Sequence, residues 1–232
     1  MASVEEDIAP ASSARIAAVL RQAIVERRLP PGAKLPEDQI GEIYGAGRTV
    51  VRGALQELAH AGLVTLRRHR GASVAQPAAR EAREVFEARA LLEPRTARSA
   101  AQRATRADVR RLRGHVADEH AALAEGDMGR AVSLSGRFHV EIAAIADQAT
   151  IAAFIETLVS RSSLILALYW KRRDALCERH AHDALVDAIA AGDGRAAEEL
   201  MRSHLVDLLS GLDLREPEAR PMGLREALEG LK

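Results

Sequence analysis

The segment that most constrains the fold is a short stretch with a helical pattern, residues 48–60, which carries arginines along one edge. Three apolar residues recur at the spacing of one helix face and predict a helix that buries that face: Val51, Leu55 and Leu58. Arg48 and Arg52 are four residues apart and share a different side, with Thr49 beside them near the helix start. We therefore expect an amphipathic helix whose basic edge faces away from the core.

A predicted β-hairpin follows this helix after Gly62. Its strand-like runs are residues 63–66 and 72–75. The tip between them is basic and consists of Arg67, Arg68, His69 and Arg70. So many basic side chains at one tip repel one another in water, but they suit a row of phosphates or a minor groove.

Two further helices are predicted upstream. The first has an apolar stripe that begins after Ser12 and Ser13, either of which can cap it, and it ends at Pro30-Pro31-Gly32. The second covers residues 37–44, and residues 45–47 form a tight turn before the basic helix. Three helices and a hairpin predict a winged helix-turn-helix, in which arginines at the start of the third helix can contact bases and phosphates. For the arginine pair taken alone, a solvated helix face remains the alternative.

The charge distribution favours the same interpretation. The whole chain has 33 basic and 33 acidic residues, so its net charge does not indicate a nucleic-acid partner. Residues 10–76, however, hold 10 Lys/Arg against 5 Asp/Glu, a balance of +5, while residues 77–232 hold 23 against 25. The positive charge is concentrated in the predicted helix-turn-helix.

Residues 14–76 resemble the winged helix-turn-helix of the GntR family of bacterial transcriptional regulators. The resemblance rests on these segments: Pro31-Gly32, Leu35-Pro36-Glu37, residues 48–52, Ala54-Leu55, Leu58, residues 62–64 and Gly71. It implies double-stranded operator DNA as the partner. The implied DNA contacts are Arg48, Thr49, Arg52, Arg70 and Gly71, and basic Lys34 is a further candidate.

Two positions depart from the family pattern. Gly47 stands where Ser or Thr is usual, which removes a capping hydroxyl, although glycine is a tolerable cap. Gly53 stands where an acidic residue is usual, and a glycine inside a helix costs about 1 kcal/mol relative to alanine. Neither change removes a basic contact.

The rest of the chain predicts an all-α bundle. Glycine and proline become sparse after the expected linker at Gln76-Pro77, and no segment has the strand period. The expected helices cover residues 79–103, 106–125, 127–146, 149–170, 172–191 and 193–212, with a weak one near 222–230. We therefore expect a disordered arm (1–12), a DNA-binding domain (13–76), a helical effector-binding and dimerisation domain (77–213) and a tail (214–232).

Three histidines lie on apolar stripes of three of these helices: His139, His182 and His204. A single inward histidine is more often a core residue than a ligand. Three that converge in one bundle favour a divalent metal site, because imidazole is a common ligand for zinc and its neighbours. His180, by contrast, falls on a polar face and is expected to be exposed.

Residues 79–212 carry a second resemblance, to the FCD ligand domain of FadR-like GntR regulators. It rests on Phe138-His139, on Ala181-His182 with the apolar residues after it, and on His204-Leu205. It implies that the three histidines bind metal together with an aspartate, whose position is taken here by Ser135. It also implies that Arg89 points toward the effector, which favours a small carboxylate. A structural pair between Arg89 and Glu93 is the alternative.

Other classes of protein fit less well. The Glu-x-x-His spacing of a helical metalloenzyme occurs once, at Glu57 and His60 in the basic helix, and no phosphate-binding glycine loop is present. Cys177 is the single cysteine, which favours a reducing cytoplasm. The longest apolar run, residues 164–170, is too short to span a membrane.

Together with these patterns, the two resemblances imply a bacterial, cytoplasmic, homodimeric repressor that binds a palindromic operator and is switched by a small carboxylate, with a divalent metal ion, zinc first, as the candidate cofactor. A constitutive DNA-binding dimer with a metal-free bundle is the alternative.

Overall fold

The N-terminal part of the chain is a three-helix unit with a small sheet. The computed structural model describes residues 12–170 and 176–214. The elements of this first unit are α1 (Ser13–Val25), β1 (Lys34–Leu35), α2 (Glu37–Tyr44), α3 (Arg48–His60), β2 (Val64–Arg67) and β3 (Gly71–Val74). The predicted winged helix-turn-helix is thereby confirmed. β1 is an addition, because a two-residue strand is too short to show an alternating pattern; it pairs antiparallel with β3 and gives the order β1-β3-β2.

Local sequence explains where these helices begin and end. The hydroxyl of Ser12 caps α1 by accepting a hydrogen bond from the backbone N–H of Arg15 at 3.2 Å. Gly45 ends α2 in the left-handed region at φ 60°, where glycine carries no steric penalty. Gly47 is the N-cap of α3 and offers no side-chain bond, as expected.

The C-terminal part is a bundle of long helices that confirms the predicted ones, with ends differing by a few residues. They are α4 (Ala79–Arg103), α5 (Arg106–Ala124), α6 (Met128–Ile145), α7 (Ala149–Tyr169), α8 (Leu176–Ala190) and α9 (Gly194–Ser210). Side-chain caps at Thr105, Asp127 and Asp193 begin α5, α6 and α9. The weak helix near 222–230 lies outside the described residues, as do most of the predicted arm and tail.

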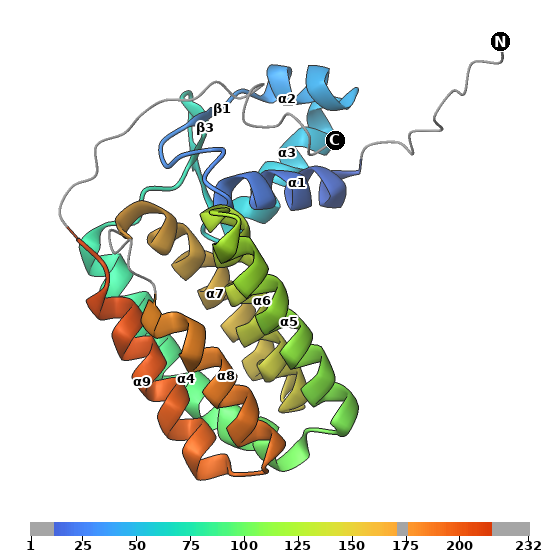
Figure 1. Cartoon of the computed structure of the whole chain (residues 1–232). Helices are drawn as coiled ribbons and strands as arrows, with labels where there is room; N and C mark the ends of the chain where they lie inside the picture. Colours follow the sequence, from blue (N-terminus) through green and yellow to red (C-terminus); the bar gives the residue numbers. More distant parts are fainter. Residues whose placement is uncertain (1–11, 171–175, 215–232) are drawn as a thin grey trace, which may run out of the picture.

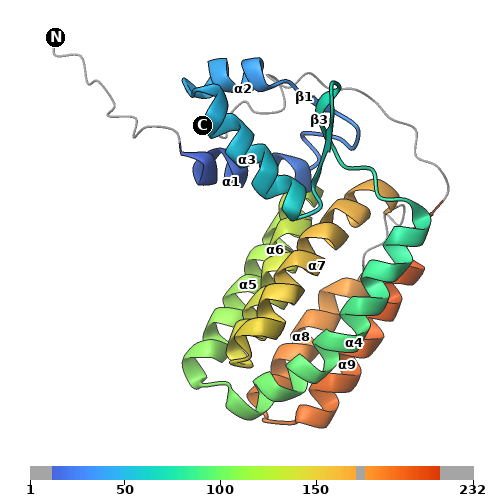
Figure 2. The ribbon, with the colours of Figure 1, turned by 180° about the vertical axis from the view of Figure 1, so that it is seen from behind.

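The two units pack end to end, with the winged helix-turn-helix on one end of the bundle (Figures 1 and 2). Leu164 of α7 is buried in the apolar core of the N-terminal unit. Arg161, also of α7, packs against Gly62, and Arg27 donates a hydrogen bond to the carbonyl of Leu166 at 2.5 Å. The expected linker at Gln76-Pro77 is held against α7 as well, because the carbonyl of Pro77 accepts a 2.7 Å hydrogen bond from the Tyr169 hydroxyl. α7 therefore belongs to both units.

α7 is more apolar along its length than the sequence analysis indicated. Its window Ala149–Leu166 is long and apolar enough to cross a membrane by length and composition, with a mean hydropathy of 1.4, which the seven-residue run 164–170 did not reveal. Core helices of soluble proteins pass the same test, so this is weak evidence for a membrane span. Here α7 packs against α4 and α6 and into the core of the N-terminal unit.

Candidate DNA-binding surface and buried histidine site

The start of α3 carries an exposed basic edge. Arg48, Thr49 and Arg52 are all exposed, while Val51 and Leu55 on the opposite face are buried. The Nε atom of Arg48 lies 3.2 Å from a carboxylate oxygen of Asp38, but both side chains are more than three-quarters exposed, so this pair is weak. Both arginines are therefore accessible to a ligand.

The hairpin places further basic groups beside this helix. A groove of about 400 Å³ between α3 and the hairpin is lined by Glu37, Arg52, Leu55, Gln56, Leu66, Arg67, Arg68, His69 and Gly71. Gly71 has a φ of 72° and His69 a φ of 60°, so the tip turns sharply and presents exposed Arg70 at its end. Lys34 is exposed on neighbouring β1. Gln56, which we did not predict, lies on the same exposed side of α3 as Arg52.

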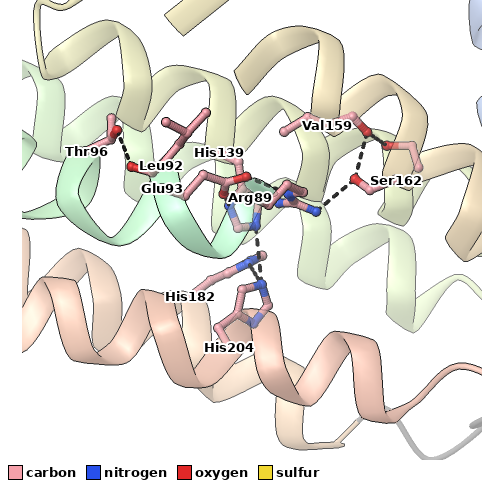
Figure 3. A network of polar contacts seen from close by, with 10 residues as sticks. Arg89, Leu92, Glu93, Thr96, His139, Val159, Ser162, His182 and His204 are labelled. Atoms are coloured by element: carbon pink, nitrogen blue, oxygen red, sulfur yellow. Dashed lines mark hydrogen bonds and ion pairs between the residues drawn. The ribbon is translucent and has the colours of Figure 1, made fainter. Parts of the chain in front are cut away.

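The three predicted histidines meet in the middle of the bundle (Figure 3). His139 of α6, His182 of α8 and His204 of α9 are each at most 3% exposed. The Nε2 atom of His204 lies 3.2 Å from Nε2 of His139 and 3.1 Å from Nε2 of His182. They form the one cluster within the described residues able to hold a metal ion.

Two buried carboxylates orient two of these rings. Glu93 Oε2 lies 2.7 Å from Nδ1 of His139, and Glu119 Oε2 lies 2.7 Å from Nδ1 of His182. An ionised carboxylate only accepts hydrogen bonds, so each Nδ1 carries the proton and each Nε2 presents a lone pair to the centre. Glu119 was not predicted, although it continues the apolar stripe of Leu112 and Val116 at helical spacing.

Arg89 is buried and pairs with Glu93, which was the alternative we considered. Its Nε and Nη2 atoms lie 2.5 and 3.2 Å from the Glu93 carboxylate, and its Nη1 donates to the hydroxyl of Ser162 at 2.8 Å. The chain of contacts therefore runs from His139 through Glu93 and Arg89 to α7 (Figure 3).

The protonation states suit metal binding. Burial raises the pKa of Glu93, but Arg89 and His139 outweigh it and hold this pKa at about 2. Burial lowers the pKa of His139 to about 4 although Glu93 opposes the shift. Burial and the adjacent His182 also lower the pKa of His204 well below its usual value. His139 and His204 are therefore neutral at pH 7, as ligation requires.

The donor set fits a tetrahedral ion of the zinc type. Zn–N bonds of about 2.0–2.1 Å imply nitrogen separations near 3.3 Å, close to the 3.1 and 3.2 Å between the Nε2 atoms. Ser135, one helical turn before His139, is partly buried. It brings a neutral hydroxyl where the family resemblance implies a carboxylate.

Comparisons with known proteins agree with both halves of the chain. Residues 12–74 match the bacterial regulatory proteins of the gntR family, and residues 84–207 match the FCD domain. The probable D-xylose utilization operon transcriptional repressor of Paenarthrobacter nicotinovorans is 30% identical over 80% of this chain and 82% of its own. The Uxu operon transcriptional regulator of Escherichia coli K12 is 30% identical over 82% of each chain.

Among solved structures, a GntR transcriptional regulator from Rhodococcus sp. RHA1 shares the fold, with a TM-score of 0.76 at 24% identity over 85% of this chain and 95% of that one. These relatives are transcriptional regulators and not enzymes, which confirms our expectation and excludes the helical metalloenzyme. The chain belongs to the GntR family of transcriptional regulators and carries the FCD domain at its C-terminal end.

Proposed function

We propose that the protein is a homodimeric repressor in the bacterial cytoplasm, whose operator binding is switched by a small carboxylate bound at the histidine site through a divalent ion, zinc first. One observation carries the ligand part of this proposal. The Nε2 lone pairs of His139 and His182 both point at Nε2 of His204, whose single N–H can satisfy only one of them. A bound cation satisfies all three nitrogens at once.

The DNA part rests on the exposed edge of α3 and the basic hairpin. In the proposed complex Arg48, Thr49 and Arg52 contact the major groove, while Arg70, Gly71 and Lys34 contact phosphates or the minor groove. Two copies related by a two-fold axis bind the two halves of a palindromic operator.

The outer face of α4 supports pairing with a second copy. Leu91 is 74% exposed on this face, and the flanking helices expose Phe154 of α7 and Val206 of α9. If two α4 helices pair antiparallel about Leu91, Glu87 of one copy lies opposite Arg95 of the other. Glu84 then lies opposite Arg98 by the same symmetry. The face is thus self-complementary, which favours a second copy of this chain as its occupant.

α7 supplies the proposed connection between the site and the DNA-binding unit. Ser162 accepts a hydrogen bond from Arg89, and two residues later Leu164 enters the core of the N-terminal unit. Ligand binding that moves His139 acts on Glu93 and Arg89, and through Ser162 on α7. Direct contact of the effector with Arg89 stays a prediction.

The DNA assignment is tested with a pool of randomised duplexes. We expect the protein to enrich an inverted repeat, and Arg48→Ala/Arg52→Ala to lower its affinity for that repeat by roughly 2–6 kcal/mol, from about 1–3 per base-reading arginine. Arg106→Ala/Arg110→Ala is the control, since these exposed arginines have the same spacing on α5 of the bundle. Equal loss in both double variants, or none in either, contradicts the assignment to α3.

A further inference from the structure

We infer that the groove between α3 and the hairpin reads one A·T base pair in each operator half-site, with Gln56 contacting the adenine and Leu66 contacting the methyl group of the paired thymine. The inference rests on the proposed binding of operator DNA and deepens it, because it names two residues that select the base sequence. Neither side chain is charged, so neither adds to the sequence-independent attraction for phosphates.

Leu66 brings an apolar side chain into an otherwise polar groove. In the described part of the N-terminal unit it is the one large hydrophobic residue that is exposed, at 45%. It pairs across the hairpin with Ala72 and lies two residues after Val64, and both of these are buried. Since alternate residues of a strand share a face, Leu66 lies on the face that covers the core. Its side chain therefore extends this apolar surface into the groove, which Leu55 of α3 also lines.

Gln56 supplies an amide from the α3 side of the groove. It is exposed and lies four residues after Arg52, so both side chains share one face of the helix and line the groove. Neither side chain has a hydrogen-bond or ion-pair partner among the described residues. The amide has an acceptor and two donors, which match N7 and the N6 amino group of adenine in the major groove.

The spacing along α3 allows the two side chains to read separate base pairs. Four residues of a helix rise by about 6 Å. Neighbouring base pairs of DNA are about 3.4 Å apart. Gln56 therefore reaches a base pair one or two steps away from the one that Arg52 contacts.

The groove suits the edge of a base pair better than a phosphate. Glu37, at the start of α2, is half-buried and lines the groove as well. Its carboxylate repels a phosphate, and the aliphatic side chain of Leu66 offers a phosphate no hydrogen bond. Arg67 and Arg68 follow Leu66 toward the hairpin tip, where they attract the phosphates that flank the base edges.

An A·T pair satisfies both sides of the groove at once. Thymine carries a methyl group in the major groove, and apolar side chains contact it. The adenine and the thymine of one pair stand side by side, as Gln56 and Leu66 do on the two sides of the groove. A G·C pair has no such methyl group, and its guanine presents two acceptors where adenine presents a donor and an acceptor.

Operator duplexes that lack single groups test the inference. The probe is the inverted repeat enriched from randomised duplexes, altered in both half-sites and titrated by fluorescence anisotropy. Deoxyuridine in place of thymidine removes only the methyl group, and 7-deazaadenine in place of adenine removes only N7. At one A·T pair per half-site, we expect deoxyuridine to lower the affinity of the unaltered protein about fourfold per half-site. We expect 7-deazaadenine to lower it about fivefold or more.

Each protein variant should lose its response to one of these changes and keep the other. Leu66→Ala should bind the thymidine and deoxyuridine duplexes equally and still distinguish 7-deazaadenine, and Gln56→Ala should do the reverse. Leu66→Gln, which has a polar side chain of similar size, repeats the test in case the truncation disturbs the fold. Thr65→Ala is the control, because Thr65 lies on the other face of β2 and should keep both responses.

The possible failures are distinct. If no repeat is enriched, the proposed binding of operator DNA fails and the inference fails with it. If a repeat is enriched but no deoxyuridine replacement changes its affinity, the inference is overturned and operator binding stands. A response to deoxyuridine that persists in folded Leu66→Ala and Leu66→Gln overturns the role of Leu66. A response to 7-deazaadenine that persists in Gln56→Ala overturns that of Gln56.

Discussion

Gly53 lies at the point where α1 packs closely against α3. It lies in the middle of α3, where glycine is normally unfavourable, yet a Cβ atom there would lie 2.8 Å from Oγ and 3.3 Å from Cβ of Ser13. The Ser13 hydroxyl donates a hydrogen bond to the carbonyl of Val50 at 2.9 Å and holds α1 against α3. The departure from the family pattern at this position therefore has a packing cause that the sequence alone did not reveal.

At the residue scale, we predict that Gly53→Ala fails to stabilise the protein. Gly114→Ala is the matched control: Gly114 lies exposed inside α5, and a Cβ atom added there would meet no neighbour within 4 Å, so the change should gain about 0.5–1 kcal/mol of unfolding free energy. Removing the obstacle in Gly53→Ala/Ser13→Ala should recover part of that gain. Denaturant unfolding measures all of these variants, and equal stabilisation by Gly53→Ala and Gly114→Ala would contradict the close contact.

At the scale of elements, α7 is the helix that links the polar network of the bundle to the DNA-binding unit. On its bundle side the Ser162 hydroxyl accepts from Arg89. Toward the DNA-binding unit, Arg161 packs against Gly62 and the Ser160 hydroxyl lies 3.4 Å from Arg21 of α1, while Arg161 also forms an ion pair with Glu81 of α4. These contacts are made within three consecutive residues, so a small displacement of the helix reaches both units.

We predict that Ser162→Ala uncouples the two units. DNA binding without ligand should change little, whereas the effect of zinc with acetate on operator affinity should fall by about 1 kcal/mol or more, within the usual range of coupling free energies. Ser163→Ala is the control, because Ser163 is buried next in sequence and its hydroxyl donates to the same Val159 carbonyl but does not contact Arg89. Fluorescence anisotropy with labelled operator measures the operator affinity of both variants. If zinc with acetate changes that affinity equally in both, Ser162 does not connect the histidine site to the DNA-binding unit.

Prediction from the sequence succeeded for features visible in the residue pattern of a single helix. It fell short for features that depend on contacts between segments distant in sequence. The three histidines were found because each interrupts an apolar stripe, and their convergence followed. Glu119 was missed because a lone acidic residue on a helix usually faces solvent, and its partner His182 is 63 residues away. The strand β1 and the shared role of α7 were missed for a related reason, since both depend on contacts distant in sequence.

At the scale of the whole molecule, the exposed stripe of α4 bears on assembly. Glu84, Ala88, Leu91, Arg95 and Arg98 repeat at alternating spacings of four and three residues, the spacing of a helix-pairing seam. In this structure Glu84 pairs with Arg80, both exposed, and Arg98 pairs with Glu198, which is 28% exposed. Ion pairs this accessible to water are weak enough to exchange partners.

We predict that Leu91→Glu makes the protein monomeric, because it places two like charges on the two-fold axis. Glu87→Arg should weaken the dimer by opposing Arg95 of the second copy, and Glu87→Arg/Arg95→Glu should restore it, since the swap preserves complementarity. Sedimentation equilibrium measures the association constants. A dimer unaffected by all three changes would place the interface elsewhere.

The burial of Leu164 in the core of the winged helix-turn-helix has a consequence for exchanging parts between regulators. The chain looks divisible at residues 76–77, between the end of the gntR match at residue 74 and the start of the FCD match at residue 84. A DNA-binding unit cut there would lose the α7 side chain that fills its core, and a foreign sensor domain would bring a different one. A hybrid made by recombination, in the laboratory or in evolution, must therefore keep the Ser160–Leu164 segment of α7 together with the DNA-binding unit. Without it, the connection between the histidine site and DNA binding is lost.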